Sequence, residues 1–255
     1  MRILYFGDIV GDKVLKVLKD NIEEIKREYK VNMVLANGEN ITSGKGLSFK
    51  HYKELRSLGV CGVSMGNHTF SKSEIKDFIN EEAICRPANL NTEYGKGYIY
   101  IKYNDKTIAL VNMLGRVFLN TPLDCPFQTM DKLLEEIKAD HIIVDFHAEA
   151  TSEKKAFFYE YAGKVDAVVG SHTHTQTADE QVLNNTCFIT DMGMCGAYNS
   201  ILGDDTQSII KRFRSGVYEP LSVANDNEFI INAVVLDLND VKNTITRVNK
   251  KIVMA

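Results

Sequence analysis

The chain has 255 residues, a net charge of −4 and a hydrophobic fraction of 44%, as is typical of a globular protein with a full core. The negative charge argues against a global basic field that would attract nucleic acid. No apolar run approaches the length of a membrane span, and the N-terminal apolar stretch is too short for a signal peptide, so we expect no membrane partner. The five cysteines are scattered and form no CxxC pair, which favours reduced thiols and a cytoplasmic protein.

The first third of the chain alternates between apolar strands and amphipathic helices. Strands are predicted over residues 2–6, 32–36 and 60–65. Helices are predicted over residues 13–29, from an N-cap at Ser48 to Leu58, and after an N-cap at Ser71. This β-α-β-α-β order is typical of a parallel sheet with helices packed on it.

The remainder of the chain mixes antiparallel and parallel signals. The turn-like triplet Asn104-Asp105-Lys106 predicts a hairpin between residues 98–103 and 107–113. Further strands are predicted over residues 142–146, 167–170, 187–191, 228–238 and 243–248, the last two separated by Asn239-Asp240. Further helices are predicted over residues 130–139, 153–162 and 207–213. No Gly-rich or Pro/Ser-rich linker interrupts the chain, so residues 1–255 are interpreted as a single α/β domain with two mixed sheets.

Polar side chains follow five of the predicted strands. They are Asp8, Glu39, Asn40, Asn67, His68, His147, His172 and His174. In an open α/β sheet the carboxyl ends of the strands line one crevice, so residues far apart in the sequence would meet there. Imidazole, carboxylate and amide groups are donors that hold divalent metals. The pattern therefore indicates a metal-dependent enzyme.

A site for two metal ions needs a bridging acid and capping ligands on each ion. Glu39 has two carboxylate oxygens and can bridge, and Asp8 can hold one ion. His172 and His174 lie two residues apart and project to one side of an extended segment. A lone histidine is more often a structural residue than a ligand, and we assign that ordinary role to His51 and His141.

The segment 38–46 resembles a phosphate loop but does not match one. Five residues separate its first two glycines, and Gly46 follows Lys45 where a P-loop has Ser or Thr. We therefore interpret Lys45 as a solvated loop lysine, although it remains a candidate phosphate contact. Arg212 and Arg214 are interpreted as part of a solvated face.

Taken in order, the polar blocks resemble the calcineurin-like metallophosphoesterase superfamily. Its usual motifs run D-x-H, G-D-x-x-D, G-N-H-D/E, a single H and G-H-x-H, and the similarity here spans positions 8 to 174. The resemblance implies a four-layer α/β/β/α sandwich with a dinuclear metal site. Val10, Glu39-Asn40 and Thr69 depart from the usual motifs, and these departures resemble the bacterial 2′,3′-cyclic-nucleotide phosphodiesterase branch.

The likeness to this branch implies a role for each site residue. It gives one metal to Asp8, Glu39, Asn40 and His174, the other metal to Glu39, Asn67, His147 and His172, and the role of catalytic acid to His68. The donor set suits Fe, Mn, Zn or Co, and the family favours iron or manganese. A hydroxide between the metals would attack phosphorus, and His68 would protonate the leaving oxygen.

The resulting expectation is a metal-dependent phosphoric diester hydrolase that acts on 2′,3′-cyclic nucleotides or related phosphodiesters. RNA-derived ligands and a homo-oligomeric state are left open by the sequence. Two alternatives stay beside this expectation. One is a metal-dependent phosphomonoesterase, and the other is a regulatory nucleotide- or phosphate-binding protein with little turnover.

Overall fold

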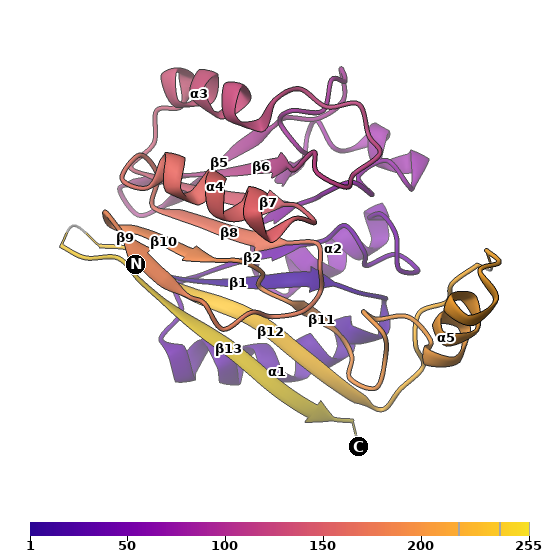
Figure 1. The fold of residues 1–255 in the computed structure, drawn as a ribbon. Helices are drawn as coiled ribbons and strands as arrows, with labels where there is room; N and C mark the ends of the chain where they lie inside the picture. The colour runs from indigo at the N-terminus through magenta and orange to yellow at the C-terminus, as the bar shows by residue number, and fades with distance from the viewer. Residues whose placement is uncertain (219, 240, 255) are drawn as a thin grey trace.

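The first sheet of the computed structural model is built around the N-terminal strands (Figure 1). The model describes residues 1–218, 220–239 and 241–254. Seven strands form this sheet in the order β13-β12-β11-β1-β2-β3-β4. Their bounds are β1 Arg2–Ile9, β2 Met33–Asn37, β3 Val60–Ser64, β4 Ile84–Cys85, β11 Met194–Ala197, β12 Glu228–Asp237 and β13 Thr244–Val253. Strands β1 to β4 are parallel, and β12 runs antiparallel to β1, β11 and β13.

The second sheet lies against the first and has six strands in the order β5-β6-β7-β8-β10-β9. Their bounds are β5 Tyr98–Tyr103, β6 Lys106–Leu114, β7 His141–His147, β8 Ala167–Ser171, β9 Gln181–Leu183 and β10 Thr186–Ile189. The four central strands are parallel, and the hairpins β5–β6 and β9–β10 add an antiparallel strand at each edge. Both sheets are therefore mixed.

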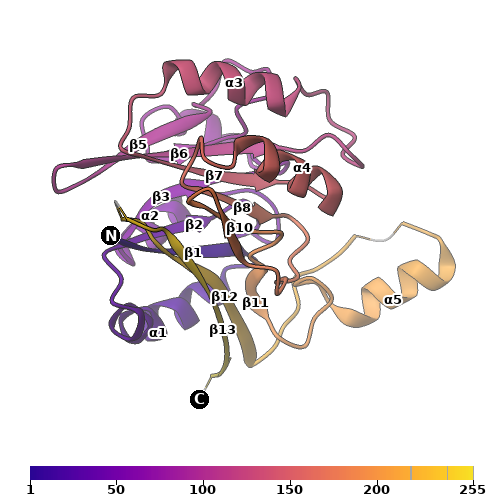
Figure 2. The same ribbon diagram turned by 60° about the vertical axis from the view of Figure 1, so that its left-hand side comes forward.

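Helices cover the outer face of each sheet, which produces four layers (Figures 1 and 2). The helices are α1 Lys13–Tyr29, α2 Phe49–Ser57, α3 Pro126–Glu136, α4 Thr151–Tyr161 and α5 Thr206–Ser215. Helices α1 and α2 pack on the first sheet, and α3 and α4 pack on the second. Only α5 stands away from the body of the molecule (Figure 2). The observed architecture is the predicted α/β sandwich.

Strand β1 shows why the sequence pattern produces these layers. Its side chains alternate, so Ile3 and Tyr5 enter the core between the sheets while Leu4 and Phe6 enter the core beneath α1 and α2. Because both faces are covered, the strand is apolar throughout and all four residues are buried. Burying such apolar surface is the main stabilising contribution to the fold.

Most predicted elements occur within two residues of their expected bounds, but several expectations were wrong. Ser71 does not cap a helix, because the segment that contains Ile75 is a short 3₁₀ helix, η1 Ser73–Asp77, preceded by Lys72. Helix α3 begins four residues before the expected start, where Pro126 occupies the first helical turn. The short strands β4, β9 and β11 were not predicted. Asp240, expected in the last turn, lies outside the described residues.

No helix in the described part of the chain combines the length and apolar character that crossing a bilayer requires.

Candidate active site

The polar residues that follow the strands come together at one edge of the sandwich. Asp8 lies at the end of β1, and Glu39 lies two residues beyond β2. His147 is the last residue of β7, and His172 directly follows β8. Strands from both sheets therefore contribute, because the carboxyl ends of their parallel strands face the same way.

Three donor atoms converge on the Nε2 atom of the buried His147 ring, which is itself a donor atom. Its Nε2 atom lies 2.8 Å from Glu39 Oε1, 3.1 Å from Asn67 Oδ1 and 3.1 Å from His172 Nδ1. The donor atoms of Glu39, His147 and His172 all lie within 4.8 Å of one another. This spacing and this mixture of imidazole, carboxylate and amide donors fit a divalent cation.

A buried hydrogen-bond chain fixes the tautomer of His147. Ser171 Oγ donates to Asp145 Oδ1 at 2.5 Å, so the hydroxyl has only lone pairs left for His147 Nδ1, which lies 2.8 Å away. In its neutral form, His147 must then carry its proton on Nδ1 and can present Nε2 as a ligand. Asp145 also accepts from Asn37 and Ser64 in the first sheet. This carboxylate thus links both sheets to the site.

The other two imidazoles are oriented by acceptors outside the cluster. His172 Nε2 lies 3.1 Å from Glu149 Oε2, which favours a proton on Nε2 and leaves Nδ1 toward His147. His174 Nδ1 donates to Leu202 O at 2.7 Å, so its Nε2 can act as a ligand. Each ring therefore presents a lone pair and has a partner for its proton.

Two further oxygens in the site have no hydrogen-bond donor. Asp8 Oδ1 and Asn40 Oδ1 are buried and unpartnered within the described residues. The amide of Asn40 donates from Nδ2 to Gly44 O at 3.0 Å, which fixes its oxygen as the free atom. A buried oxygen without a donor is costly unless a cation or water satisfies it. These oxygens therefore also fit metal binding.

The electrostatics of the site favour a cation at the same place. Asp8 and Glu39 are buried, and neither pairs with Lys or Arg in the described part of the chain. Burial would lower the pKa of His147, but Glu39, Asp8 and Asp145 outweigh burial and raise it to about 9. Burial would raise the pKa of Glu39, but His147 and His68 lower it to about 2. Burial raises the pKa of Asp8 to about 6. The buried carboxylates of Asp8 and Glu39 thus favour a positive charge, from a proton or a cation, near His147 Nε2.

His68 differs from the other histidines because its ring is not part of the cluster. Its backbone N–H donates to Glu39 Oε2 at 2.9 Å, and its Nδ1 lies 3.4 Å from Ser71 Oγ. Thr69, which replaces the usual acidic residue, donates to Gly66 O at 2.6 Å and closes the turn. Burial lowers the pKa of His68, and Glu39 opposes that effect. The ring lines the pocket, where it can exchange a proton with a bound molecule.

Gly66 makes room for the cluster. A Cβ atom at this position would lie 2.3 Å from Glu39 Oε2 and 2.5 Å from His147 Nε2. Any larger residue would therefore displace two of the converging side chains. The Gly-Asn-His block needs its glycine because of this close approach.

A buried ion pair holds the loop that carries His172 and His174. Lys154 Nζ lies 2.8 Å from Asp191 Oδ2, and the same oxygen accepts from Thr173 N and Thr173 Oγ1 at 3.0 and 2.8 Å. Both histidines have positive φ angles, 99° and 62°, which are strained for residues other than glycine. The hydrogen bonds to Thr173 keep this unusual loop in place.

Sequence reasoning gave no role to Asp145, Ser171, Lys154 or Asp191. The sequence contained one signal for these supporting residues, which was the acidic residue Asp145 inside an apolar strand. Asp145 lies on the same face of that strand as His147, two residues later. His51 and His141 lie outside the cluster, as expected. His51 contacts Thr42 and Ser48, and His141 contacts Asp166.

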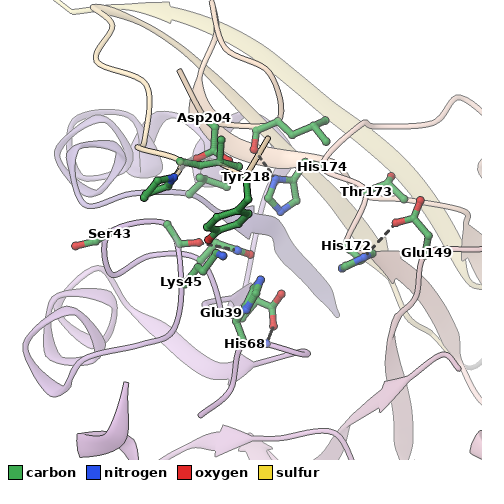
Figure 3. Close-up of a pocket in the computed structure, with 16 residues that line it drawn as sticks. Glu39, Ser43, Lys45, His68, Glu149, His172, Thr173, His174, Asp204 and Tyr218 are labelled. Carbon is green, nitrogen blue, oxygen red and sulfur yellow. Dashed lines mark hydrogen bonds and ion pairs between the residues drawn. The ribbon is translucent and has the colours of Figure 1, made fainter. Parts of the chain in front are cut away.

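The cluster opens into a pocket of about 410 Å³ (Figure 3). Lys45 is exposed, as expected for a loop lysine, but it also lines this pocket.

Val10 occupies the position where the superfamily usually has histidine, and it also lines the pocket. It packs against Gly203, where an added Cβ atom would lie 2.4 Å from Val10 Cγ1.

The four layers define a metallophosphoesterase-like fold, and the strand-end cluster gives it a candidate metal site. A structure from Staphylococcus aureus named for a 5′-nucleotidase shares the fold with a TM-score of 0.57 and 14% identity, covering 100% of this chain and 54% of that chain. The chain belongs to the family described as YmdB-like protein, whose model matches residues 4–251.

Two relatives are more similar over nearly their whole length. The 2′,3′-cyclic-nucleotide 2′-phosphodiesterase of Bacillus subtilis (strain 168) is 44% identical over 245 residues, which cover 94% of this chain and 92% of the relative. A crystal structure described as a novel phosphatase from Mycoplasma pneumoniae has a TM-score of 0.92 and 35% identity, covering 99% of this chain and 93% of that chain.

These findings confirm the predicted resemblance and the fold, and the 44% identical relative carries the name of the predicted activity, a phosphoric diester hydrolase. The group of Glu39, His147 and His172 is a possible site for a metal ion. The identity of the metals and the role of each residue stay predictions.

Proposed function

We propose that the protein is a dinuclear metal-dependent phosphodiesterase that opens 2′,3′-cyclic nucleotides or related phosphodiesters. The convergence of Glu39, Asn67, His147 and His172 on one point at the base of a pocket carries this proposal. The activity in the name of the 44% identical relative supports the choice of substrate.

We assign Glu39, Asn67, His147 and His172 to one ion and Asp8, Glu39, Asn40 and His174 to the other. The unpartnered oxygens of Asp8 and Asn40 and the outward-protonated ring of His174 support the second set. Iron or manganese suits these donors best, and zinc or cobalt are the alternatives. Divalent ions would activate water and neutralise charge on the phosphoryl group.

The residues of the chain itself position and protonate the substrate. His68 lies at the pocket wall and would donate a proton to the 2′-oxygen as its bond to phosphorus breaks, which leaves a 3′-monophosphate. General acid catalysis of this kind contributes about 10²–10⁴ in rate. Lys45 lines the same pocket and can pair with a phosphate oxygen. No acidic residue within the described ranges lies within 4.0 Å of its ammonium group.

One rival function has support of its own. The Mycoplasma pneumoniae relative is described as a phosphatase, so a phosphomonoesterase is the second candidate. A binding protein with little turnover is the outcome in which metal and nucleotide bind but no product forms.

The test is hydrolysis of 2′,3′-cyclic AMP by the purified protein, with products separated by chromatography. We expect 3′-AMP to form, a chelator to abolish the reaction, and Mn²⁺ or Fe²⁺ to restore it. Elemental analysis should find about two metal ions per chain. Faster cleavage of p-nitrophenyl phosphate than of bis(p-nitrophenyl) phosphate would instead identify a monoesterase, and chelator-insensitive hydrolysis would refute the metal-dependent mechanism.

A further inference from the structure

Side chains of two chemical kinds line the pocket. Some are the polar side chains of the candidate metal site, and others are apolar or aromatic, namely Val10, Leu202, Tyr218, Pro220 and Leu221. A pocket of about 410 Å³ with both kinds of lining fits a molecule that carries a phosphate and an apolar ring.

Tyr218 is the aromatic member of this apolar set, and its side chain lies among the pocket residues in Figure 3. The residue is 70% exposed. Within residues 1–218, 220–239 and 241–254, its recorded ring contact is with the guanidinium of Arg212, 5.0 Å from the ring centroid. An aromatic ring that borders a polar site without being packed is a surface on which another flat ring can stack.

The segment that carries Tyr218 is anchored beside the metal ligands. Leu202 O accepts the hydrogen bond from His174, and Asp205 caps helix α5 by accepting from Ser208 N at 2.9 Å. The chain comes back to the start of this segment at residues 222–224. There Asp205 N donates to Ser222 O at 2.9 Å, and Ala224 N donates to Gly203 O at 2.8 Å. Helix α5 and residues 216–218 therefore belong to an arm with a fixed base (Figure 2).

We propose that Tyr218 is a specificity-determining residue that stacks on the nucleobase of the substrate, with Arg212 behind its ring. The inference rests on the proposed function and identifies the part of the substrate that lies against Tyr218. Stacking uses the flat face that every base has, so we expect all four common bases to be accepted. Recognition would then depend on the presence of a base more than on its identity.

The test compares 2′,3′-cyclic AMP with the 2,3-cyclic phosphate of methyl riboside, which lacks a base. Tyr218→Ala should raise KM for cyclic AMP about tenfold or more, leave kcat nearly unchanged, and leave both constants for the base-free ester unchanged. Tyr218→Phe should resemble the unaltered protein because it keeps the ring. Tyr159→Ala, which removes an exposed tyrosine of α4, is the matched control.

Calorimetric binding of 3′-AMP and of ribose 3-phosphate supplies a second readout that needs no turnover. Tyr218→Ala should weaken only the binding of 3′-AMP. Equal losses for both ligands, or no loss for either, would overturn the stacking role. If the unaltered protein hydrolyses neither ester but Tyr218→Ala still weakens 3′-AMP binding, the proposed function fails and the nucleobase subsite stands.

Discussion

Four of the residues at the strand ends bring their donor atoms together, and the ring of a fifth stands apart. Glu39, Asn67, His147 and His172 meet within hydrogen-bond distance of one atom, whereas the His68 ring contacts Ser71 and faces the pocket. In the proposed mechanism this division separates metal binding from proton transfer, so we expect the two roles to be lost independently.

The first prediction uses this separation. His68→Ala should keep the metal and lower kcat by about 10²–10⁴, because only the proton donor is removed. His172→Ala should lose both metal and activity, because it removes a donor atom from the cluster. Elemental analysis and rate measurements on the same samples check both. Unchanged turnover in the His68 variant would remove that residue from the mechanism.

The second prediction concerns the hydrogen-bond chain behind His147. Ser171→Ala removes the acceptor of the Nδ1 proton, so we expect metal affinity to fall about 10- to 100-fold. Ser64→Ala is the matched control, because Ser64 also donates to Asp145 but does not contact His147. Competition with a fluorescent chelator measures the affinities. Equal losses in the two variants would show that Ser171 acts only through the packing around Asp145.

Sequence reasoning found the residues whose side chains point into the crevice and missed those beneath them. Histidines after strands are conspicuous, whereas Asp145 is one polar residue inside an apolar strand. Its meaning depends on which residues of the other sheet face it, here Tyr5, Asn37 and Ser64. A single sequence contains no direct signal for such contacts between sheets.

The length of a helix or strand determined whether it could be predicted from the sequence. Helix α1 has the bounds expected from its spacing of apolar residues. Strand β4 has two residues and β9 has three, which is too short to show alternation. The 3₁₀ helix η1 was mistaken for an α-helix because a single turn shows nearly the same spacing of apolar residues in both.

The third prediction belongs to the β9–β10 hairpin. Asp179 lies before β9 and accepts from Thr177 and from Thr190, which follows β10. Burial opposes ionisation, but the hydrogen bonds from Thr190 and Thr177 outweigh it and lower the pKa of Asp179 below its usual 3.8. The ionised form therefore stabilises the hairpin above pH 3.8, and this contribution is lost as the pH falls through the lowered pKa.

Asp179→Asn should therefore lower the free energy of unfolding at pH 7 by about 1 kcal/mol, since the group is partly solvated. The difference from the unaltered protein should shrink toward zero below pH 3.8. Denaturant unfolding at several pH values measures it, with Asp105→Asn in the exposed β5–β6 turn as the control for a lost charge. A difference that does not vary with pH would contradict this account of the hairpin.

For the whole molecule, the sequence predicted the layers better than the connections that position the site. The alternation of apolar residues in strands and their spacing in helices indicated two sheets covered by helices. Burial of one face gives each type of element its own period of apolar residues. The partners of β1 change along its length, from β12 at residues 2–6 to β11 at residues 8–9. That change of partner strand brings residues 193–195 beside Asp8. No local sequence pattern predicts the change.

The ion pair of Lys154 and Asp191 joins the outer helical layer to the loop that carries His172 and His174. Lys154 belongs to α4, which packs on the second sheet, and its side chain is wholly buried. A sequence change that shifts Lys154 would therefore release the loop from the layer behind it. On the proposed function, we expect such a change to weaken metal retention together with resistance to unfolding.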